Sequence, residues 1–245
     1  MRGKVAPANS MIGAASWLTP PRVDEPELLD LGLGSPEDVQ ASLADLWRIN
    51  RFLGGLDSIA RPLYNRLPTH SGTITCVDIG AGSAEVSTAL VRGGQRRGYD
   101  IQMIAVDFAR RNLELADSES IHRVQSDAFH LPLAANSVDY VISSLLLHHF
   151  KPEQVIDLLC SAATVARHGI IMSDLVRGWL PMAAFKVLQP IFARSTITRY
   201  DGMVSLRRAY TPAEMREMAA TAGLSNCKIH VFHPWFRMTL TADKV

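Results

Sequence analysis

The sequence predicts an α/β fold, a doubly wound and mostly parallel sheet of seven strands with helices at its N-terminal side. Two observations carry this prediction. Short apolar runs alternate with helical stretches between residues 74 and 175, which is the pattern of right-handed β-α-β units. A glycine-rich turn, VDIGAGSAE (77–85), stands where the first apolar run meets the first helical stretch. Together they indicate a Rossmann-like sheet covered by helices on both faces.

The length and composition suit one such domain with room for additions. The chain has 245 residues, of which 47% are hydrophobic and 20% charged, and its formal net charge is +1. This charge gives no general attraction for nucleic acid. The sequence also has no run of about 18 apolar residues, so we expect no membrane insertion. Cys76, Cys160 and Cys227 lie far apart, so we expect no disulfide framework, no metal site and a cytoplasmic location. The sequence leaves the oligomeric state open.

The segments before the sheet divide into a tail and a helical cap. Residues 1–34 lack a helical or strand period, and we expect them to form a disordered or loosely attached tail. Residues 35–68 form the cap. Ser35 is a suitable N-cap and Pro36 a suitable first helical residue, which predicts a helix to about residue 52. A glycine pair at 54–55 ends it, and a second helix follows over 56–67.

The sheet domain is expected over residues 69–245. The apolar runs that predict its first five strands are 74–80, 101–107, 122–127, 137–144 and 169–175, and the intervening helices are 84–96, 109–118 and 152–167. Residues 179–208 interrupt this alternation with an apolar, proline-containing helical stretch, which we interpret as a lid insertion. A last helix over 210–224 precedes two strands, 227–234 and 236–242. Their close connection predicts an antiparallel pair at the end of the sheet.

The glycine-rich turn is a candidate ligand site because ligands of open α/β sheets bind beyond the carboxyl ends of the strands. Gly80 and Gly82 let the backbone turn sharply and approach a ligand closely. A nicotinamide site would need glycine or alanine where this chain has Glu85, whose carboxylate would repel a pyrophosphate. Asp78 likewise favours a ligand that carries an amino group and a sulfonium.

Acidic residues also end the next two strands. Asp107 is positioned to accept hydrogen bonds from ribose hydroxyls, and Phe108 could stack on a purine. Asp127 could accept from an adenine amino group. Each acid alone is more often a turn or cap residue. Three acids at the ends of three successive strands, beside a glycine turn, indicate a nucleoside site.

These motifs resemble those of the class I S-adenosylmethionine-dependent methyltransferases. VDIGAGSAE resembles their D-x-G-x-G motif, AVDFA their ribose-binding motif, and SDAFHLPLAANSVDYVISS their adenine-binding and fourth-strand motifs. The last phrase is typical of the subgroup of quinone-biosynthesis and natural-product methyltransferases, and the resemblance covers roughly residues 70–242. One departure is Ala84, where a third glycine is often seen. The resemblance implies S-adenosylmethionine as the cofactor, bound by Asp78, Gly80, Ala81, Gly82, Asp107, Phe108, Asp127, Ala128, Phe129, Ser143 and Ser144.

The acceptor would lie past the fourth strand, at SSLLLHHF (143–150). This stretch lacks the Asn/Asp-Pro-Pro-Tyr/Phe motif of methylases that act on base amines or glutamine amides. His148 and His149 are candidate catalytic bases because histidine titrates near neutrality. The interpretation that we favour is that one or both bond to backbone carbonyls at the turn. Because adjacent residues seldom face one cavity, we expect at most one to be catalytic.

Further polar and aromatic residues could line the acceptor side, namely Asp174, Arg177, Trp179, Tyr200 and Arg208. Surface ion pairs and ordinary packing are the alternatives for these residues. An apolar lid would suit a small, hydrophobic or aromatic acceptor that is methylated on oxygen or carbon. Two other functions stay open: a non-catalytic methyltransferase-like binding or assembly subunit, and a nicotinamide-dependent oxidoreductase, which Glu85 disfavours.

Overall fold

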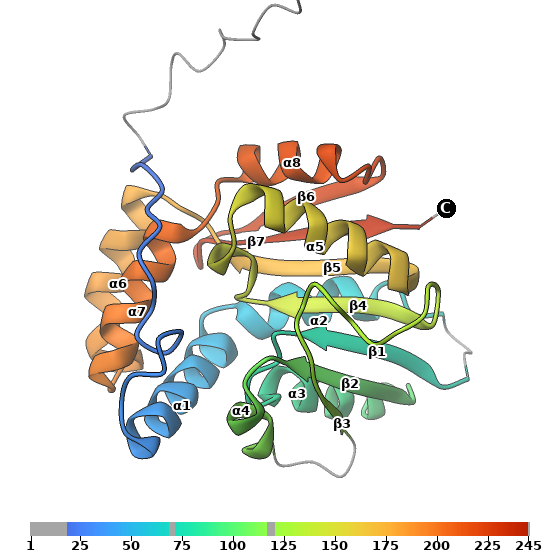
Figure 1. The fold of residues 1–245 in the computed structure, drawn as a ribbon, viewed down its shortest axis with the longest axis horizontal. Helices are drawn as coiled ribbons and strands as arrows, with labels where there is room; N and C mark the ends of the chain where they lie inside the picture. The colour runs from blue at the N-terminus through green and yellow to red at the C-terminus, as the bar shows by residue number, and fades with distance from the viewer. Residues whose placement is uncertain (1–18, 69–71, 117–120, 245) are drawn as a thin grey trace, which may run out of the picture.

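The computed structural model of the chain describes residues 19–68, 72–116 and 121–244. These residues form one seven-stranded sheet with the strand order β3-β2-β1-β4-β5-β7-β6, flanked by helices (Figure 1). Every adjacent pair of strands is parallel except the two pairs that contain β7. The predicted fold class and the antiparallel pair at the end of the sheet are therefore confirmed.

The strands and helices follow the predicted order closely. The strands are β1 (Ile74–Ile79), β2 (Ile101–Asp107), β3 (Ile121–Gln125), β4 (Val138–Ser144), β5 (Ala166–Leu175), β6 (Cys227–Phe232) and β7 (Arg237–Asp243). The helices are α1 (Pro36–Phe52), α2 (Gly55–Tyr64), α3 (Glu85–Gln95), α4 (Arg110–Glu114), α5 (Pro152–Val165), α6 (Trp179–Phe192), α7 (Thr196–Arg208) and α8 (Pro212–Thr221), with a short 3₁₀ helix, η2 (Leu147–His149), after β4. Helix α4 is shorter than expected, and residues 117–118 of that prediction lie outside the described residues.

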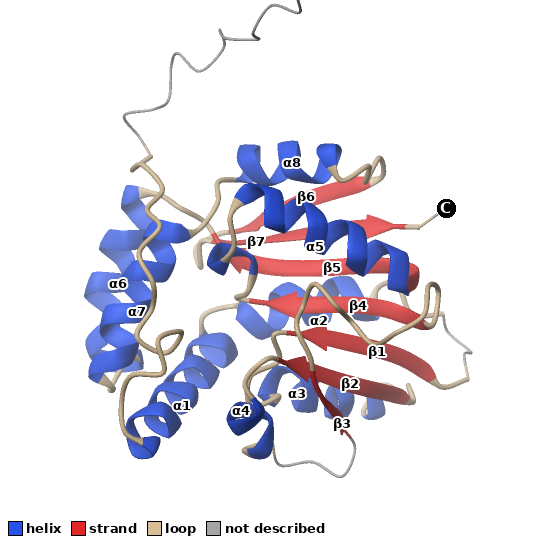
Figure 2. Cartoon of the chain, viewed as in Figure 1, coloured by secondary structure: helices blue, strands red, loops and turns tan. Residues whose placement is uncertain are grey.

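The sheet lies between two helical layers (Figure 2), and an apolar core fills the space on each side of it. Helices α5 and α8 pack together and contact β4, β5 and β6, with Leu158 and Met218 fully or almost fully buried. Helices α2 and α3 contact β2, β4, β5 and β7 through a second core that includes Ile59 and Leu90. Within the described residues, no helix has the length and apolar character needed to cross a membrane.

The N-terminal segment departs from the predicted loose attachment. Residues 1–18 lie outside the described residues, but residues 19–34 run along α7 to the end of the sheet (Figure 1). The Arg22 guanidinium donates to the backbone oxygens of His148 at 3.0 Å and Phe150 at 2.9 Å. The backbone N–H groups of Leu28 and Leu29 donate to the Asp201 carboxylate. These bonds fix the second half of the predicted tail beside the strand ends.

The predicted lid region forms two helices rather than one interrupted stretch. Helix α6 contains Pro190 and ends at Phe192, and Ser195 caps α7 by accepting a hydrogen bond from the Ile197 N–H. Both helices lie with α1 beyond the carboxyl ends of the central strands (Figure 1). Helices α6 and α7 contact one another and each also contacts α1. Helices α1, α6 and α7 thus gather at the edge of the sheet where a ligand is expected, whereas α2 packs on one face of the sheet.

Candidate active site

The carboxyl ends of β1, β2 and β4, together with the loop after β3, surround a cavity of about 1010 Å³. Register brings these ends together, since Ser143 of β4 aligns with Ile79 of β1. Most of the residues predicted to bind the cofactor line this cavity or a smaller pocket beside it. Those in the large cavity are Gly80, Gly82, Asp107, Phe108, Asp127, Ala128 and Phe129, and those in the smaller pocket include Asp78, Ala81 and Ser144.

The glycine-rich turn needs both of its glycines for different reasons. Gly80 has φ +71°, and a Cβ at this position would lie 2.7 Å from Leu146 Cδ1. Gly82 has φ +57°, and a Cβ there would point into open space. Gly80 is thus required by packing and backbone conformation. Gly82 leaves the backbone bare toward the cavity, as close approach of a ligand requires.

The acids at the end of β2 and after β3 accept hydrogen bonds from backbone N–H groups of the surrounding loops. Asp107 accepts hydrogen bonds from the backbone N–H of Gly82 and of Ala109, both at 2.8 Å, and so ties the glycine turn to β2. Phe108 beside it is 78% exposed, which leaves its ring free to cover a base. Asp127 accepts from the Phe129 N–H at 3.0 Å, which is the largest cause of its lowered pKa.

The smaller pocket, of about 120 Å³, is lined by three residues that each have a buried side-chain oxygen without a hydrogen-bond donor among the described residues. Asp78 Oδ1, Asn50 Oδ1 and Ser144 Oγ have no hydrogen-bond partner within the described parts of the chain. The other Asp78 oxygen accepts from the Ser87 hydroxyl at 2.6 Å. Burial raises the pKa of Asp78 to about 7, against the opposing effect of the Ser87 bond. A ligand ammonium group would satisfy these oxygens and favour the charged carboxylate.

A second cavity, of about 360 Å³, opens on the side of α1, α6 and α7. Its wall is mostly apolar and includes Leu46, Ile49, Pro181, Phe185, Leu188 and Trp235. Leu46 and Leu145 line this cavity, the large cavity and the small pocket alike. Leu145 has φ +58°, a strained conformation for a branched side chain, at the point where the three spaces meet.

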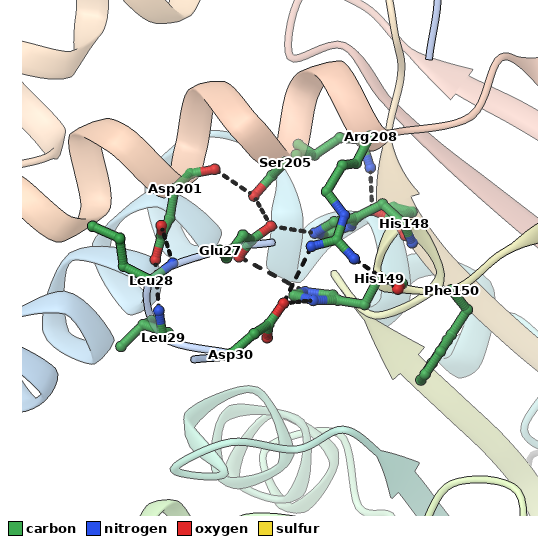
Figure 3. Close-up of polar contacts among 12 residues, drawn as sticks. Glu27, Leu28, Leu29, Asp30, His148, His149, Phe150, Asp201, Ser205 and Arg208 are labelled. Carbon is green, nitrogen blue, oxygen red and sulfur yellow. Dashed lines mark hydrogen bonds and ion pairs between the residues drawn. The ribbon is translucent and has the colours of Figure 1, made fainter. Parts of the chain in front are cut away.

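Glu27, His148 and His149 form a polar corner (Figure 3), and all three line the apolar cavity. His148 Nε2 lies 3.4 Å from Glu27 Oε1, and His149 Nε2 lies 3.9 Å from Glu27 Oε2. Each histidine has its Nδ1 on a different carboxylate, Asp174 at 2.6 Å and Asp30 at 2.9 Å. Glu27 and His149 line both larger cavities.

The corner differs from the sequence-based expectation in two ways. The ring partners are carboxylates, not the backbone carbonyls that we favoured. Both histidines also line the acceptor-side cavity, because η2 stacks their rings with centroids 4.3 Å apart. The expectation that adjacent histidines face different spaces is therefore wrong in this turn.

Burial and charge act in opposite directions on these groups. Burial favours neutral His148, but the charges and hydrogen bonds of Asp174 and Glu27 outweigh it and raise the pKa of His148 to about 10. Burial likewise opposes ionisation of Glu27 and Asp174, yet their contacts with His148 hold the pKa of each carboxyl below its ordinary value. The contacts with Asp174 and Glu27 thus favour the doubly protonated, charged form of His148 in the unliganded chain.

The other predicted acceptor-side residues lie mostly behind the cavity wall. Asp174 holds His148, and Arg177 donates to Glu214, Ala209 O and Pro20 O. Arg208 bonds to Asp30 and to the His149 backbone oxygen. The exposed Tyr200 donates to Glu25, and Trp179 is 54% exposed at the start of α6. Ser143, assigned to the cofactor, donates to Ile79 O inside the sheet.

Two residues of the site escaped the sequence analysis. Glu27 precedes the first helix in a segment without periodicity, and it is only 6% exposed. Arg237, at the start of β7, lines the acceptor-side cavity and is 1% exposed. Neither of its Nη atoms has a hydrogen-bond partner in the described part of the chain, and burial lowers its pKa to about 10 despite the nearby Asp174. In the sequence, the one available signal was an arginine within the apolar run that predicts the last strand.

Comparison with known proteins adds a family match over part of the chain. Residues 77–172 match the family model described as a methyltransferase domain. The chain is 28% identical over 165 residues to the biotin biosynthesis bifunctional protein BioHC of Cellvibrio japonicus (strain Ueda107). That match covers 66% of this chain and 32% of BioHC, so the chain spans about a third of the length of this curated relative.

Solved structures with the same fold include two methyltransferases. One is a SAM-dependent methyltransferase from Aquifex aeolicus, with a TM-score of 0.57 and 14% identity, over 87% of this chain and all of the other. Another is magnesium protoporphyrin IX methyltransferase (ChlM) from Synechocystis PCC 6803 with bound SAH. It has a TM-score of 0.54 and 15% identity over 85% of this chain and 86% of the other. At these identities the likeness concerns the fold.

Proposed function

We propose that this chain, whose residues 77–172 match a methyltransferase domain, uses S-adenosylmethionine to methylate an oxygen or carbon of a small, hydrophobic or aromatic molecule. When bound, S-adenosylmethionine supplies an activated methyl group on a sulfonium. The residues of the chain then need to align the acceptor, exclude water and accept a proton where one is lost.

The observation that carries this proposal is the meeting of two cavities. The large cavity at the strand ends and the apolar cavity under α6 and α7 share Glu27, Leu46, Leu145 and His149. Methyl transfer is an in-line displacement, so the acceptor atom must face the methyl carbon on the side opposite the sulfur. A cofactor in one cavity and an acceptor in the other can meet in this way at a narrow junction. A junction walled by two leucines and a polar corner supports such an approach.

The lining of the second cavity supports the acceptor class. Phe185, Leu188 and Trp235 offer apolar surface that favours a hydrophobic or aromatic body. Arg237 contributes a buried positive charge at the wall, which favours an acceptor with an acidic oxygen such as a phenol, an enol or a carboxylic acid. We therefore assign the acceptor to the space between Arg237 and the polar corner.

The roles of the two histidines differ in this proposal. His148 is buried and held between Asp174 and Glu27, so we assign it the role of orienting its neighbours. His149 and Glu27 border both cavities and are the polar groups that meet the acceptor oxygen. Leu46 and Leu145 exclude water from the junction.

The test has two stages. Calorimetric titration with S-adenosylhomocysteine should show one binding site, and its absence at high micromolar ligand would overturn the proposal at once. Methyl-labelled S-adenosylmethionine is then offered with a panel of apolar phenols, enols and aromatic carboxylic acids, against polar acceptors of similar size. Transfer confined to the apolar panel is expected, whereas binding of the cofactor product without transfer to any acceptor would favour a non-catalytic binding subunit.

A further inference from the structure

The polar corner has the composition of a metal site. Glu27 Oε, His148 Nε2 and His149 Nε2 all lie within 4.8 Å of one another (Figure 3). Metal bonds of roughly 2.0–2.2 Å place neighbouring ligand atoms about 3 to 3.5 Å apart. The 3.4 Å between His148 Nε2 and Glu27 Oε1 already fits. The 3.9 Å between His149 Nε2 and the other carboxylate oxygen, Glu27 Oε2, needs only a small side-chain rotation.

The groups behind the two imidazoles match a metal site as well. Metal-binding histidines usually donate the other ring N–H to a carboxylate, which fixes the ring and leaves one nitrogen free for the metal. Here Asp174 accepts from Nδ1 of His148 and Asp30 lies on Nδ1 of His149, so both Nε2 atoms are directed at Glu27. Asp174 also accepts from the His148 backbone N–H at 2.9 Å, which fixes that ring further.

The carboxylates around the corner balance positive charge there, whether that charge is a proton on His148 or a metal ion, and the nearby Arg237 supplies part of the balance for Asp174. Three carboxylates, those of Glu27, Asp30 and Asp174, touch the two imidazoles. Within the described residues, the only guanidinium that bonds to any of the three is that of Arg208, which reaches Asp30 at 3.2 Å. Glu27 is further oriented by the Ser205 hydroxyl at 2.7 Å.

From this geometry we propose that Glu27, His148 and His149 bind a divalent first-row transition-metal ion such as Zn²⁺ or Fe²⁺. Two imidazoles and one carboxylate leave coordination positions open, and those positions face the acceptor-side cavity that Glu27, His148 and His149 line. The purpose of the site rests on the proposed function: a bound ion would hold the acceptor oxygen in its ionised form, with the acceptor proton released to water, beside the incoming methyl group.

The competing interpretation is an ion-pair clasp. In that case a proton on His148 takes the place of the metal, and the corner only fastens residues 19–34 to the end of β4. Both interpretations use the same contacts, so the two must be separated by measuring metal directly rather than by loss of stability or activity.

The experiment uses the full, tag-free chain, freed of metal by a chelator and titrated anaerobically with Co²⁺, then with Zn²⁺ as a competitor. We expect visible d–d absorption that saturates at one equivalent and is displaced by Zn²⁺. Glu27→Gln and His149→Asn should each weaken Co²⁺ binding by at least about 100-fold, and Asp30→Asn by about tenfold, as for other outer carboxylates.

Two controls resemble these variants outside the corner. Glu25→Gln changes a carboxylate on the same segment that bonds to Tyr200 and Arg207, and His168→Asn changes an exposed histidine 3.5 Å from Asp139. Both should bind Co²⁺ like the unchanged chain. Melting temperatures verify that every variant is folded, and His149 is the safer histidine to change because its side chain is 22% exposed.

Absence of saturable Co²⁺ binding, or equal binding by the corner variants and the controls, would leave an ion-pair clasp only and overturn the metal site. The result is independent of methyl transfer. Metal binding without transfer would overturn the proposed function alone, and transfer by a metal-free chain that binds no Co²⁺ would overturn the metal site alone.

Discussion

The cofactor side and the acceptor side of this site are built in opposite ways. On the cofactor side, each predicted group sits within a few residues of a strand end, as Asp78, Gly82 and Asp107 do. On the acceptor side, the wall combines residues 19–34 with α1, α6, α7 and the loop before β7, which meet only in the folded chain. The first region follows from local geometry, and the second depends on long-range packing.

This difference teaches which region tolerates change. The glycine turn and the acids behind it must meet one cofactor in one geometry, so each is fixed by backbone conformation and hydrogen bonds. The acceptor wall is made of exchangeable apolar side chains around a small polar corner. Substitutions on the cofactor side should therefore abolish binding, whereas those on the acceptor side should alter selectivity.

The largest expected effect breaks the cofactor side at Asp107. Replacing it in Asp107→Ala removes the acceptor of the Gly82 and Ala109 N–H groups and frees the glycine turn from β2. Hydrogen bonds to a charged group contribute about 1.5–3 kcal/mol each, so S-adenosylhomocysteine should bind at least about 100-fold more weakly by calorimetry. Asp100→Ala, before the other end of β2, is the control and should bind normally. Equal weakening by both variants would contradict a local role for Asp107.

The fold and the cofactor side were predictable because strand period and turn residues are local signals. The acceptor side was not, and Glu27 shows why. It stands in a segment with no periodicity, and only its contacts with His148, His149 and Ser205 give it a role. The η2 turn likewise stacks two adjacent histidines into one cavity, an arrangement that no residue pattern specifies.

The second prediction sharpens the cofactor side through pH. Burial raises the pKa of Asp78 to about 7, so below pH 7 the proposed partner of the cofactor ammonium is protonated. Affinity for S-adenosylhomocysteine should then fall by about tenfold for each pH unit below 7, and Asp78→Asn should bind weakly at every pH. Calorimetry at pH 6, 7 and 8 measures this. A flat profile in the unchanged chain would contradict the assignment.

The same carboxyl should affect stability with the opposite sign. Because its folded-state pKa lies above its unfolded value of 3.8, its contribution to stability is largest below pH 3.8 and is lost as pH rises through 7. Asp78→Asn should therefore raise the melting temperature of the cofactor-free chain at pH 8 while it impairs binding. A lowered melting temperature at pH 8 would show that the charged carboxylate has an unrecognised partner.

The third prediction concerns the acceptor side at Arg237. A buried guanidinium whose two Nη atoms have no hydrogen-bond partner among the described residues opposes folding, so Arg237→Met should leave the free energy of unfolding unchanged or raise it by about 1–3 kcal/mol. The affinity for an acidic acceptor should fall about tenfold, with cofactor binding intact. Denaturant unfolding and acceptor KM measure the two effects. The control is Arg66→Met, which removes an ion pair with Asp243 at the other end of β7. This variant should bind both the cofactor and the acceptor with unchanged affinity.

The smallest expected effect separates the acceptor wall from the surface behind it. Tyr200 is exposed and donates to Glu25, whereas Tyr210 is buried and donates to the Phe150 backbone oxygen at 2.6 Å. Tyr200→Phe removes an exposed polar contact and should leave both the free energy of unfolding and the acceptor KM unchanged. Tyr210→Phe leaves the partly buried Phe150 carbonyl with Arg22 as its remaining side-chain donor, and should lower the free energy of unfolding in denaturant by about 1–3 kcal/mol. A rise in acceptor KM for Tyr200→Phe alone would return Tyr200 to the acceptor side, where the sequence had assigned it, and would mean that α7 moves toward the cavity when the acceptor binds.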